Sequence, residues 1–254
     1  LIIKQMKILN YKFKINLISN IRKSKKNKIN MINVNYKFKN AFSQISTKSN
    51  SYLVDCFDLA LSIMKTNKKI ALVNGPISKK HFLNKKYLGV TEYIAKKTKT
   101  KKEVMLIYNK NFSVSPVTTH IPLKSVARKI NKRKIINAVL KVNEFYKKVI
   151  KLKPIIAVLG LNPHCETVSK ISEEEKIIVP SIKFLRRKNI KIDGPFAADT
   201  FFLKKNIIKY DVVVGMYHDQ VLTPIKTLFK FDAINITLGL PFMRISPDHG
   251  PNSE

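Results

Sequence analysis

A run of polar and charged side chains late in the sequence has the residue types of a site for a small anion beside a metal ion. Residues 216–220 read Met-Tyr-His-Asp-Gln, and Lys226, Asn235 and Arg244 follow them. Imidazole is a common ligand of divalent metals, and a guanidinium can hold a carboxylate or phosphate through paired hydrogen bonds. Most of these residues lie on short polar segments between apolar runs, and packing of a hydrophobic core does not require them. The segment therefore predicts a functional site.

Three of the five histidines directly follow apolar, strand-like runs: His120, His164 and His218. Neutral imidazoles from separate strand ends can hold a divalent metal with one position open for substrate, where the metal acts as a Lewis acid on a hydroxyl or carbonyl oxygen. Their spacing matches no local metal motif. The residues alone therefore leave open that each is a hydrogen-bonded loop histidine.

Several other polar residues are candidates to support such a site. Asp199 and Asp219 can orient a ligand histidine or complete the metal shell, although Asp199 also suits the N-cap of a helix. Lys226 and Arg244 lie in apolar or Gly/Pro-rich surroundings that favour anion binding over the ordinary alternative, a solvated surface cation. Asn235 lies inside a strand-like run, where its amide must find partners or cost stability.

Apolar periodicity and turn residues predict an α/β fold with a parallel or mixed sheet. Strands are expected at residues 69–74, 103–108, 112–118, 154–159, 211–216 and 233–238, and one or two short ones within residues 1–50. Helices are expected at residues 54–64 and 130–150, from the capping box of Ser172 and Glu175 to about residue 188, and from Asp199 after a break at Gly194-Pro195. Ligands of open α/β sheets collect beyond the carboxyl ends of strands, so the polar clusters at residues 74–76, 162–164 and 217–219 are expected to share one crevice.

Composition excludes several classes of protein. The 254 residues are 44% hydrophobic, which is too high for a disordered chain. The 49 Lys and Arg against 16 Asp and Glu give a net charge of +33, but the excess is spread evenly, which favours compositional drift over a nucleic-acid site. No apolar run reaches the roughly 20 residues of a membrane span. The two cysteines lack CxxC spacing, so a reducing, cytoplasmic location is expected.

The glycine content constrains how a nucleotide cofactor could bind. The chain has seven glycines and contains no GxGxxG, GxxxxGK[ST], GxSxG or HExxH motif. An ordinary Rossmann phosphate loop is therefore excluded, and a nicotinamide cofactor would have to bind in another way.

An ordered string of motifs resembles the 4-hydroxythreonine-4-phosphate dehydrogenases of pyridoxal phosphate biosynthesis, the PdxA family. The motifs lie at residues 74–79, 118–123, 160–164, 194–200, 216–220 and 235–244. The resemblance implies oxidation of 4-phosphooxy-L-threonine at its C3 hydroxyl with NAD or NADP, after which the β-keto acid loses CO₂ to give 3-amino-2-oxopropyl phosphate. It also implies a fold like that of isocitrate and isopropylmalate dehydrogenases, with a mixed sheet and non-Rossmann NAD binding. Residues 1–254 would form one catalytic unit of two interleaved α/β lobes around a central cleft, with residues 1–30 atypical.

Motif positions carry residue roles over from the family. The implied metal ligands are His120, His164 and His218, and the implied substrate-binding residues are Thr91, Lys226, Asn235 and Arg244. Zinc is the first choice of metal, with magnesium and cobalt as alternatives. The implied partners are a small phosphorylated hydroxy-amino acid and a second copy of the chain, in a homodimer that completes each active site.

The chain departs from the family pattern in three places. The family sequence Gly-His-Thr-Glu is replaced by Gly89-Val90-Thr91-Glu92, so a histidine that contacts substrate is missing. The family's glycine-rich N-terminal segment and the helix that follows residues 248–250 are also missing, so the chain is expected to be truncated at both ends. Two alternatives stay open: a dehydrogenase of threonate or erythronate 4-phosphate, and a basic binding protein without catalysis.

Overall fold

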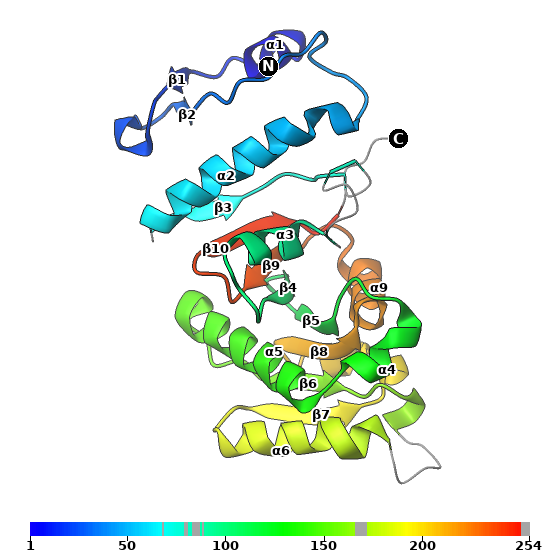
Figure 1. The fold of residues 1–254 in the computed structure, drawn as a ribbon. Coiled ribbons are helices and arrows are strands. Elements are labelled where there is room, and N and C mark those ends of the chain that lie inside the picture. Colours follow the sequence, from blue (N-terminus) through cyan, green and yellow to red (C-terminus); the bar gives the residue numbers. More distant parts are fainter. Residues whose placement is uncertain (68, 79–80, 83–86, 88, 166–171, 250–254) are drawn as a thin grey trace. The chain divides into compact units, whose positions relative to one another are not determined.

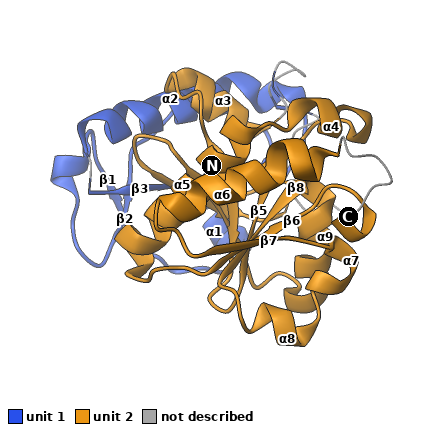
Figure 2. Ribbon diagram, turned by 90° about the horizontal axis from the view of Figure 1, so that it is seen from below, with its two compact units in different colours: residues 1–72, 77–87 blue, residues 73–76, 88–254 orange. Residues whose placement is uncertain are grey.

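The computed structural model describes residues 1–67, 69–78, 81–82, 87, 89–165 and 172–249. The chain divides into two compact units, which Figure 2 colours separately. Unit 1 comprises Leu1–Leu72 and Ile77–Tyr87, and unit 2 comprises Val73–Pro76 and Leu88–Glu254. Every residue that the sequence marks as a candidate for chemistry belongs to unit 2. The arrangement of two lobes as one catalytic unit around a cleft stays a prediction.

Unit 1 is built from short elements and one long helix. The elements are α1 (Ile2–Ile8), the parallel strands β1 (Ile15–Leu17) and β2 (Ile29–Met31), 3₁₀ turns at Ile21–Lys23 and Thr47–Ser49, and α2 (Asn50–Thr66). Helix α2 buries Phe57, Leu61 and Met64, whose i, i+4, i+7 spacing places them on one face. The helix expected at residues 54–64 is thus confirmed and is longer, whereas α1 was not predicted. Strand β3 (Ala71–Val73) ends where the chain enters unit 2.

Unit 2 contains a mixed sheet. Its strands in the described residues are β4 (Val104–Tyr108), β5 (Ser113–Thr118), β6 (Ile156–Leu159), β7 (Ile192–Phe196), β8 (Val212–Tyr217), β9 (Ile234–Leu238) and β10 (Met243–Pro247). Their spatial order is β10-β9-β4-β5-β8-β6-β7 (Figure 1). Strands β5, β8, β6 and β7 run parallel, and β10, β9, β4 and β5 pair antiparallel in turn. The predicted mixed sheet is therefore confirmed, and β10 adds a strand that the sequence did not reveal.

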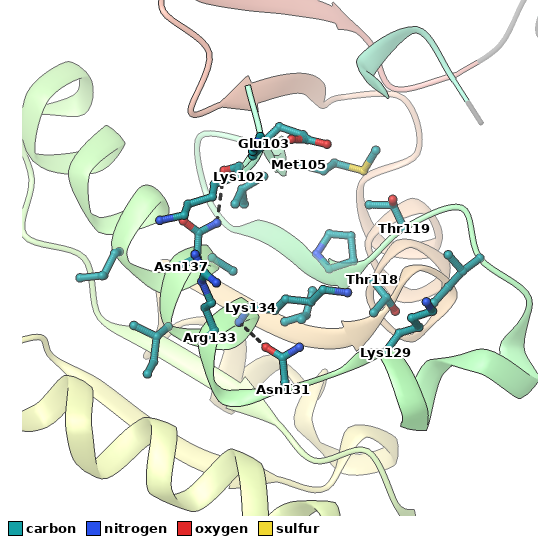
Figure 3. A pocket seen from close by; sticks show the side chains of 18 of the residues that line it. Lys102, Glu103, Met105, Thr118, Thr119, Lys129, Asn131, Arg133, Lys134 and Asn137 are labelled. Carbon is teal, nitrogen blue, oxygen red and sulfur yellow. Dashed lines mark hydrogen bonds between the residues drawn. The ribbon is translucent and has the colours of Figure 1, made fainter. Parts of the chain in front are cut away.

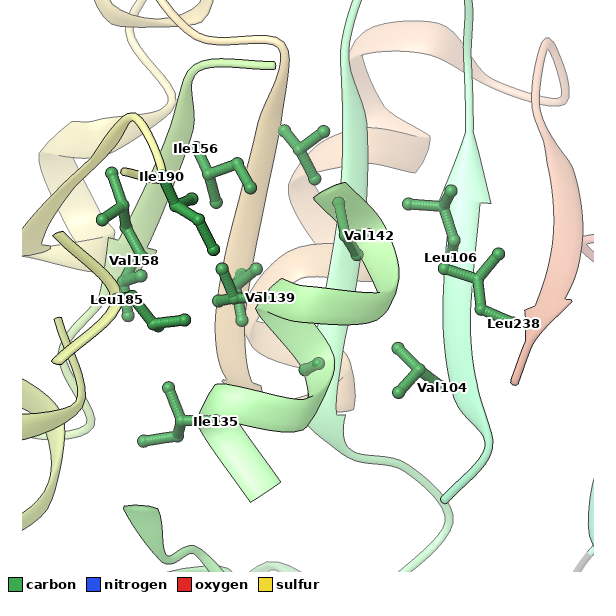
Figure 4. Packing of buried hydrophobic residues seen from close by; sticks show 14 of the residues in the cluster. Val104, Leu106, Ile135, Val139, Val142, Ile156, Val158, Leu185, Ile190 and Leu238 are labelled. Carbon is green, nitrogen blue, oxygen red and sulfur yellow. The ribbon is translucent and has the colours of Figure 1, made fainter. Parts of the chain in front are cut away.

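Helices cover both faces of this sheet, and alternate strand residues face them. The helices are α3 (Val90–Lys97), α4 (Val126–Lys129), α5 (Lys132–Phe145), α6 (Val179–Arg187), α7 (Ala198–Phe201), α8 (Lys204–Ile207) and α9 (His218–Phe229). On one face Val139 and Val142 of α5 and Leu185 of α6 pack against strand residues that include Leu106 and Val158 (Figure 4). On the other face Val221 and Ile225 of α9 pack against Val213 and Leu159. Burial on both faces explains why the central strands read as continuous apolar runs.

One predicted helix agrees with the structure, and one predicted break does not. The helix expected at residues 130–150 is confirmed: α5 begins at Lys132, because the Asn131 side chain accepts a hydrogen bond from the Lys134 N–H and caps it, and a π-helical turn at Tyr146–Ile150 continues it. Gly194-Pro195 does not break the chain but lies inside β7. This strand is at the end of the described sheet order, and an edge strand tolerates the missing N–H of Pro195. None of the helices in the described ranges has both the length and the apolar character needed to cross a bilayer.

Candidate functional site

The candidate histidines follow three neighbouring parallel strands, β5, β8 and β6. His120 comes two residues after β5, His218 is the first residue of α9 directly after β8, and His164 lies in the 3₁₀ turn Pro163–Cys165 after β6. The rings of His120 and His218 have centroids 5.6 Å apart. The clusters at residues 162–164 and 217–219 follow neighbouring parallel strands, and a crevice shared with residues 74–76 stays a prediction. His218, however, begins a helix and is not a loop residue.

Each of these imidazoles has its Nδ1 atom directed at a carboxylate. The distances are 3.2 Å from His120 Nδ1 to Glu92 Oε1, 2.6 Å from His218 Nδ1 to Asp219 Oδ1, and 3.7 Å from His164 Nδ1 to Asp199 Oδ2. A carboxylate at Nδ1 fixes the ring and leaves Nε2 as the atom that would bind a metal, which is the usual environment of a metal-ligating histidine. The donor set thus fits a divalent metal. Asp199 and Asp219 each lie at the Nδ1 atom of a candidate histidine, as a carboxylate that orients the ring would. Glu92 is a third such carboxylate, which was not predicted from the sequence.

The histidine triad itself is not assembled into a complete ligand shell. The His164 side chain is 73% exposed, and its ring faces Asp199 at the longest of the three distances. Within the described ranges, no group of three or more His, Cys, Asp or Glu side chains is placed to hold a metal ion. His120 and His218 are therefore brought together, and their combination with His164 stays a prediction.

Asp199 does not cap a helix. Ala197 is the N-cap of α7, and Asp199 lies within the helix, where its Oδ1 atom accepts a hydrogen bond from the Thr200 N–H at 2.9 Å. The N-cap alternative is therefore wrong. The second carboxylate oxygen, which faces His164, remains consistent with an orienting role.

A buried carboxylate, Glu174, holds the turn that carries His164. Its side chain accepts hydrogen bonds from the backbone N–H groups of Leu161 (2.7 Å) and Asn162 (2.8 Å), and from the Asn162 amide (2.8 Å). Glu174 is only 2% exposed. Burial raises the pKa of the Glu174 carboxyl, but the hydrogen bonds from Asn162 and Leu161 outweigh burial and leave the pKa below its ordinary value.

Gln220 ties the β6 turn to the start of α9. Its Nε2 donates to the Gly160 carbonyl at 2.7 Å, and its Oε1 accepts from the Met216 N–H at 2.7 Å. A Cβ atom at Gly215 would collide with the Val221 side chain, so glycine is required for α9 to begin this close to β8. These contacts set His218 and the His164 turn beside each other.

Arg244, on β10, is a buried cation surrounded by neutral acceptors. It is 3% exposed, and its guanidinium donates to Asn74 Oδ1 (2.9 Å), Thr91 Oγ1 (3.2 Å) and Thr237 Oγ1 (3.0 Å). Burial lowers the pKa of Arg244 to about 10, and the nearby charge of Glu92 opposes that shift. Arg244 therefore stays protonated at neutral pH, and its hydrogen bonds to neutral oxygens leave positive charge available for an anion.

The remaining two substrate-binding candidates lie along the same part of unit 2. Asn235 on β9 pairs with Ser246 of β10, and its buried Oδ1 atom has no hydrogen-bond partner in the described part of the chain. Lys226 on α9 donates to Asp248 Oδ2 at 2.9 Å. Val90 is the first residue of α3 and precedes Thr91, but its side chain supplies no polar atom there.

A pocket of about 970 Å³ opens beside Thr91 and Glu92 (Figure 3). Thr118 and Thr119, at the end of β5, line it next to His120. Cationic side chains also line it: Lys101, Lys102, Lys129, Arg133 and Lys134. This cluster was not predicted from the sequence, because its lysines do not stand out in a chain with 49 Lys and Arg.

Fold and site together define an α/β protein with imidazoles and a buried guanidinium at one mixed sheet. The chain belongs to the family of the pyridoxal phosphate biosynthetic protein PdxA, whose model matches residues 1–253. The expected family is therefore confirmed.

Individual relatives agree with this membership. The chain is 39% identical over 251 residues to a 4-hydroxythreonine-4-phosphate dehydrogenase of Sulfurihydrogenibium sp., a match that covers 97% of this chain and 77% of the relative. It is 36% identical over 198 residues to a D-threonate 4-phosphate dehydrogenase of Pectobacterium atrosepticum, covering 77% of this chain and 61% of the relative. The crystal structure of a 4-hydroxythreonine-4-phosphate dehydrogenase from Klebsiella pneumoniae superimposes with a TM-score of 0.78 at 28% identity, covering 95% of this chain and 76% of that one.

Proposed function

We propose that the chain is an NAD- or NADP-dependent dehydrogenase that oxidises 4-phosphooxy-L-threonine at its C3 hydroxyl. The β-keto acid would then lose CO₂ to give 3-amino-2-oxopropyl phosphate. One observation carries the proposal: two neighbouring residues of α3 contact the anion-binding arginine and one of the candidate metal ligands. Thr91 contacts the buried guanidinium of Arg244, and Glu92 contacts the imidazole of His120. A substrate anion bound at Arg244 therefore lies beside the histidine cluster.

The chain's own residues would bind and orient the substrate. Arg244, buried and protonated, would hold an anionic group of the substrate, with Thr91 fixing the guanidinium. The carboxylates at Nδ1 of the histidines would keep each Nε2 atom unprotonated and ready to bind metal. His120, His164 and His218 would hold a divalent ion, with zinc proposed first and cobalt or magnesium as alternatives. When bound, the metal would supply Lewis-acid polarisation of the hydroxyl oxygen and of the ketone oxygen that replaces it.

We infer a cytoplasmic homodimer that completes each active site. The exposure of His164 supports this inference, because a side chain that is 73% exposed is accessible to a second copy of the chain. The nicotinamide cofactor would bind without a Rossmann phosphate loop, since the chain has seven glycines and no GxGxxG motif.

A second candidate substrate is D-threonate 4-phosphate or its erythronate isomer. The relative from Pectobacterium atrosepticum carries the threonate name, and Val90 stands where the family pattern has a substrate-contacting histidine. Valine cannot donate a hydrogen bond, so the contacts of the substrate with this position differ from those of the family pattern.

NADH formation by the purified, zinc-loaded protein tests the proposal. We expect the highest kcat/KM with 4-phosphooxy-L-threonine, a lower value with D-threonate 4-phosphate and the lowest with erythronate 4-phosphate. Turnover with threonate phosphate alone would move the assignment to the second candidate. Absence of NAD or NADP reduction with all three substrates, together with salt-sensitive nucleic-acid binding, would favour a basic binding protein.

Replacing Glu92 with glutamine is expected to weaken zinc binding by about ten- to a hundredfold while the fold stays intact. A neutral amide holds the Nδ1–H of His120 less firmly than a carboxylate does. Competition with a chromophoric chelator measures the affinity without any assay of activity. Glu175→Gln, at an exposed glutamate, is the matched control, and equal zinc affinity of the two variants would show that Glu92 does not orient a metal ligand.

A further inference from the structure

Residues 1–54 of unit 1 carry positive charge that no carboxylate among them balances. They contain twelve of the 49 Lys and Arg and none of the 16 Asp and Glu. All twelve cations are exposed, and no ion pair in the described part of the chain involves them. The cations are spread evenly along the chain, but the acidic residues are not. An exposed, uncompensated positive surface of this kind favours a polyanion as partner.

The basic loop, residues 22–28, holds five of these twelve cations. It reads Arg-Lys-Ser-Lys-Lys-Asn-Lys and lies between β1 and β2 (Figure 1). Segments of this length that are rich in Lys and Arg are typical of nucleic-acid patches. The loop contains no apolar residue that could enter the acyl region of a bilayer. Its composition therefore favours a nucleic acid over a membrane surface.

Asparagine side chains hold the backbone of the basic loop in place. Asn30 Oδ1 accepts a hydrogen bond from the Lys25 N–H at 2.8 Å. Asn30 Nδ2 donates to the carbonyl oxygens of Lys25 and Lys28 at 2.9 and 3.3 Å. Asn16 Nδ2 donates to the Lys23 carbonyl oxygen at 3.3 Å. Because the loop backbone is ordered before binding, its cations can contact phosphates at a smaller cost in conformational entropy.

Two exposed aromatic rings belong to the segment that pairs with the end of the basic loop. Tyr11 and Phe13 are 55% and 56% exposed, and their ring centroids are 5.7 Å apart. The Ile29 N–H donates to the Lys14 carbonyl oxygen at 2.9 Å, so the backbone of Phe13 lies beside the end of the loop. Cations that contact a phosphate backbone and aromatic faces that stack on bases are the two components of a surface for single strands.

We propose that the basic loop, together with Tyr11 and Phe13, binds single-stranded nucleic acid. The Lys and Arg side chains contact phosphates, and the two rings stack on bases. Neither contact reads base identity, so the binding is independent of sequence. This surface belongs to unit 1, whereas every candidate residue of the proposed dehydrogenase belongs to unit 2. The inference therefore goes beyond the proposed function and can fail without it.

Fluorescence anisotropy with labelled oligo(U) and oligo(dT) of about 20 nucleotides tests the proposal. We expect wild type to bind these single strands more tightly than a duplex of equal length, and the affinity to fall as salt rises. Tighter binding of oligo(U) assigns the surface to RNA, and tighter binding of oligo(dT) assigns it to single-stranded DNA.

Neutralising the basic loop should weaken single-strand binding by about thirtyfold or more and lower the salt slope by up to about 3. This loop variant combines Arg22→Gln, Lys23→Gln, Lys25→Gln, Lys26→Gln and Lys28→Gln. A matched variant removes five exposed charges of unit 2 and should lose less than about threefold. It combines Lys110→Gln, Lys183→Gln, Lys191→Gln, Lys204→Gln and Lys205→Gln. Equal losses in the two variants would overturn the proposal, because they would reduce binding to overall charge.

Tyr11→Leu combined with Phe13→Leu separates base stacking from apolar contact. Leucine keeps the apolar surface and removes the aromatic face, so single-strand affinity should fall by about tenfold while duplex affinity stays unchanged. Thermal unfolding verifies the fold of each variant, and NADH formation reports separately on the site in unit 2. Duplex bound as tightly as single strands would overturn the proposal. So would binding to phosphatidylserine vesicles without binding to either oligonucleotide.

Discussion

Replacement of Arg244 with methionine is expected to lower kcat/KM for 4-phosphooxy-L-threonine by about a thousandfold. The guanidinium is buried, and its bonds to Asn74, Thr91 and Thr237 leave it charged and held in one orientation. Methionine fills similar volume but can neither donate a hydrogen bond nor carry charge. Steady-state rates of NADH formation over a range of substrate concentrations measure the loss.

Two further variants separate anion binding from other effects at this position. Arg244→Lys keeps a charge but loses the planar fork, so its kcat/KM should fall between wild type and Arg244→Met. Arg128→Met removes an exposed arginine of α4 and should leave the rate unchanged. Equal rates for wild type and Arg244→Met would mean that the guanidinium does not bind substrate.

The second large effect is expected at Glu174, on the stability of the fold. Glu174→Ala removes the acceptor of three short hydrogen bonds and leaves the half-buried donors of Leu161 and Asn162 without their protein partner. Hydrogen bonds to a charged group contribute about 1.5–3 kcal/mol each, and water can replace part of this at half-buried donors, so we expect the free energy of unfolding to fall by about 3 kcal/mol. Urea denaturation measures the change. Glu175→Ala, one residue along and exposed, should cost less than about 0.5 kcal/mol.

The same carboxyl gives the protein an acid-sensitive contribution to stability. Because the pKa of Glu174 is lowered in the folded state, its contribution is complete above the pKa of an unfolded glutamate and is lost as the pH falls through the folded pKa. Wild type should therefore lose stability in this acid range more steeply than Glu174→Gln. Parallel slopes for the two proteins would show that Glu174 does not supply this term.

The sequence predicts functional residues best where they come directly after a strand. His120, His164 and His218 could be placed at one edge because apolar runs end just before them, and parallel strands share their carboxyl edge. That reasoning needs only local pattern. It failed for Gly194-Pro195, because the tolerance of a proline inside a strand depends on whether the strand is at the sheet edge, which local pattern does not reveal.

Residues that contact the site from a distant part of the sequence could not be predicted from local sequence pattern. Glu92 contacts His120 from another element, and Asp248 meets Lys226 through the pairing of a strand end with a helix. Glu174 lies in the run that the sequence marks as a helix start, where Ser172 and Glu175 attract attention instead. The Ser172 hydroxyl does accept from the Glu175 N–H at 3.2 Å, so the helix start was recognised while the carboxylate that anchors the His164 turn was not.

We propose that three histidines at neighbouring strand ends hold one metal ion. Metal content of the purified protein, measured after zinc loading and dialysis, tests it most directly. We expect about one zinc per chain in wild type and a clear loss when His120, His164 or His218 is replaced by alanine, whereas His81→Ala should keep the metal. Full zinc content in any one of the three site variants would contradict the account.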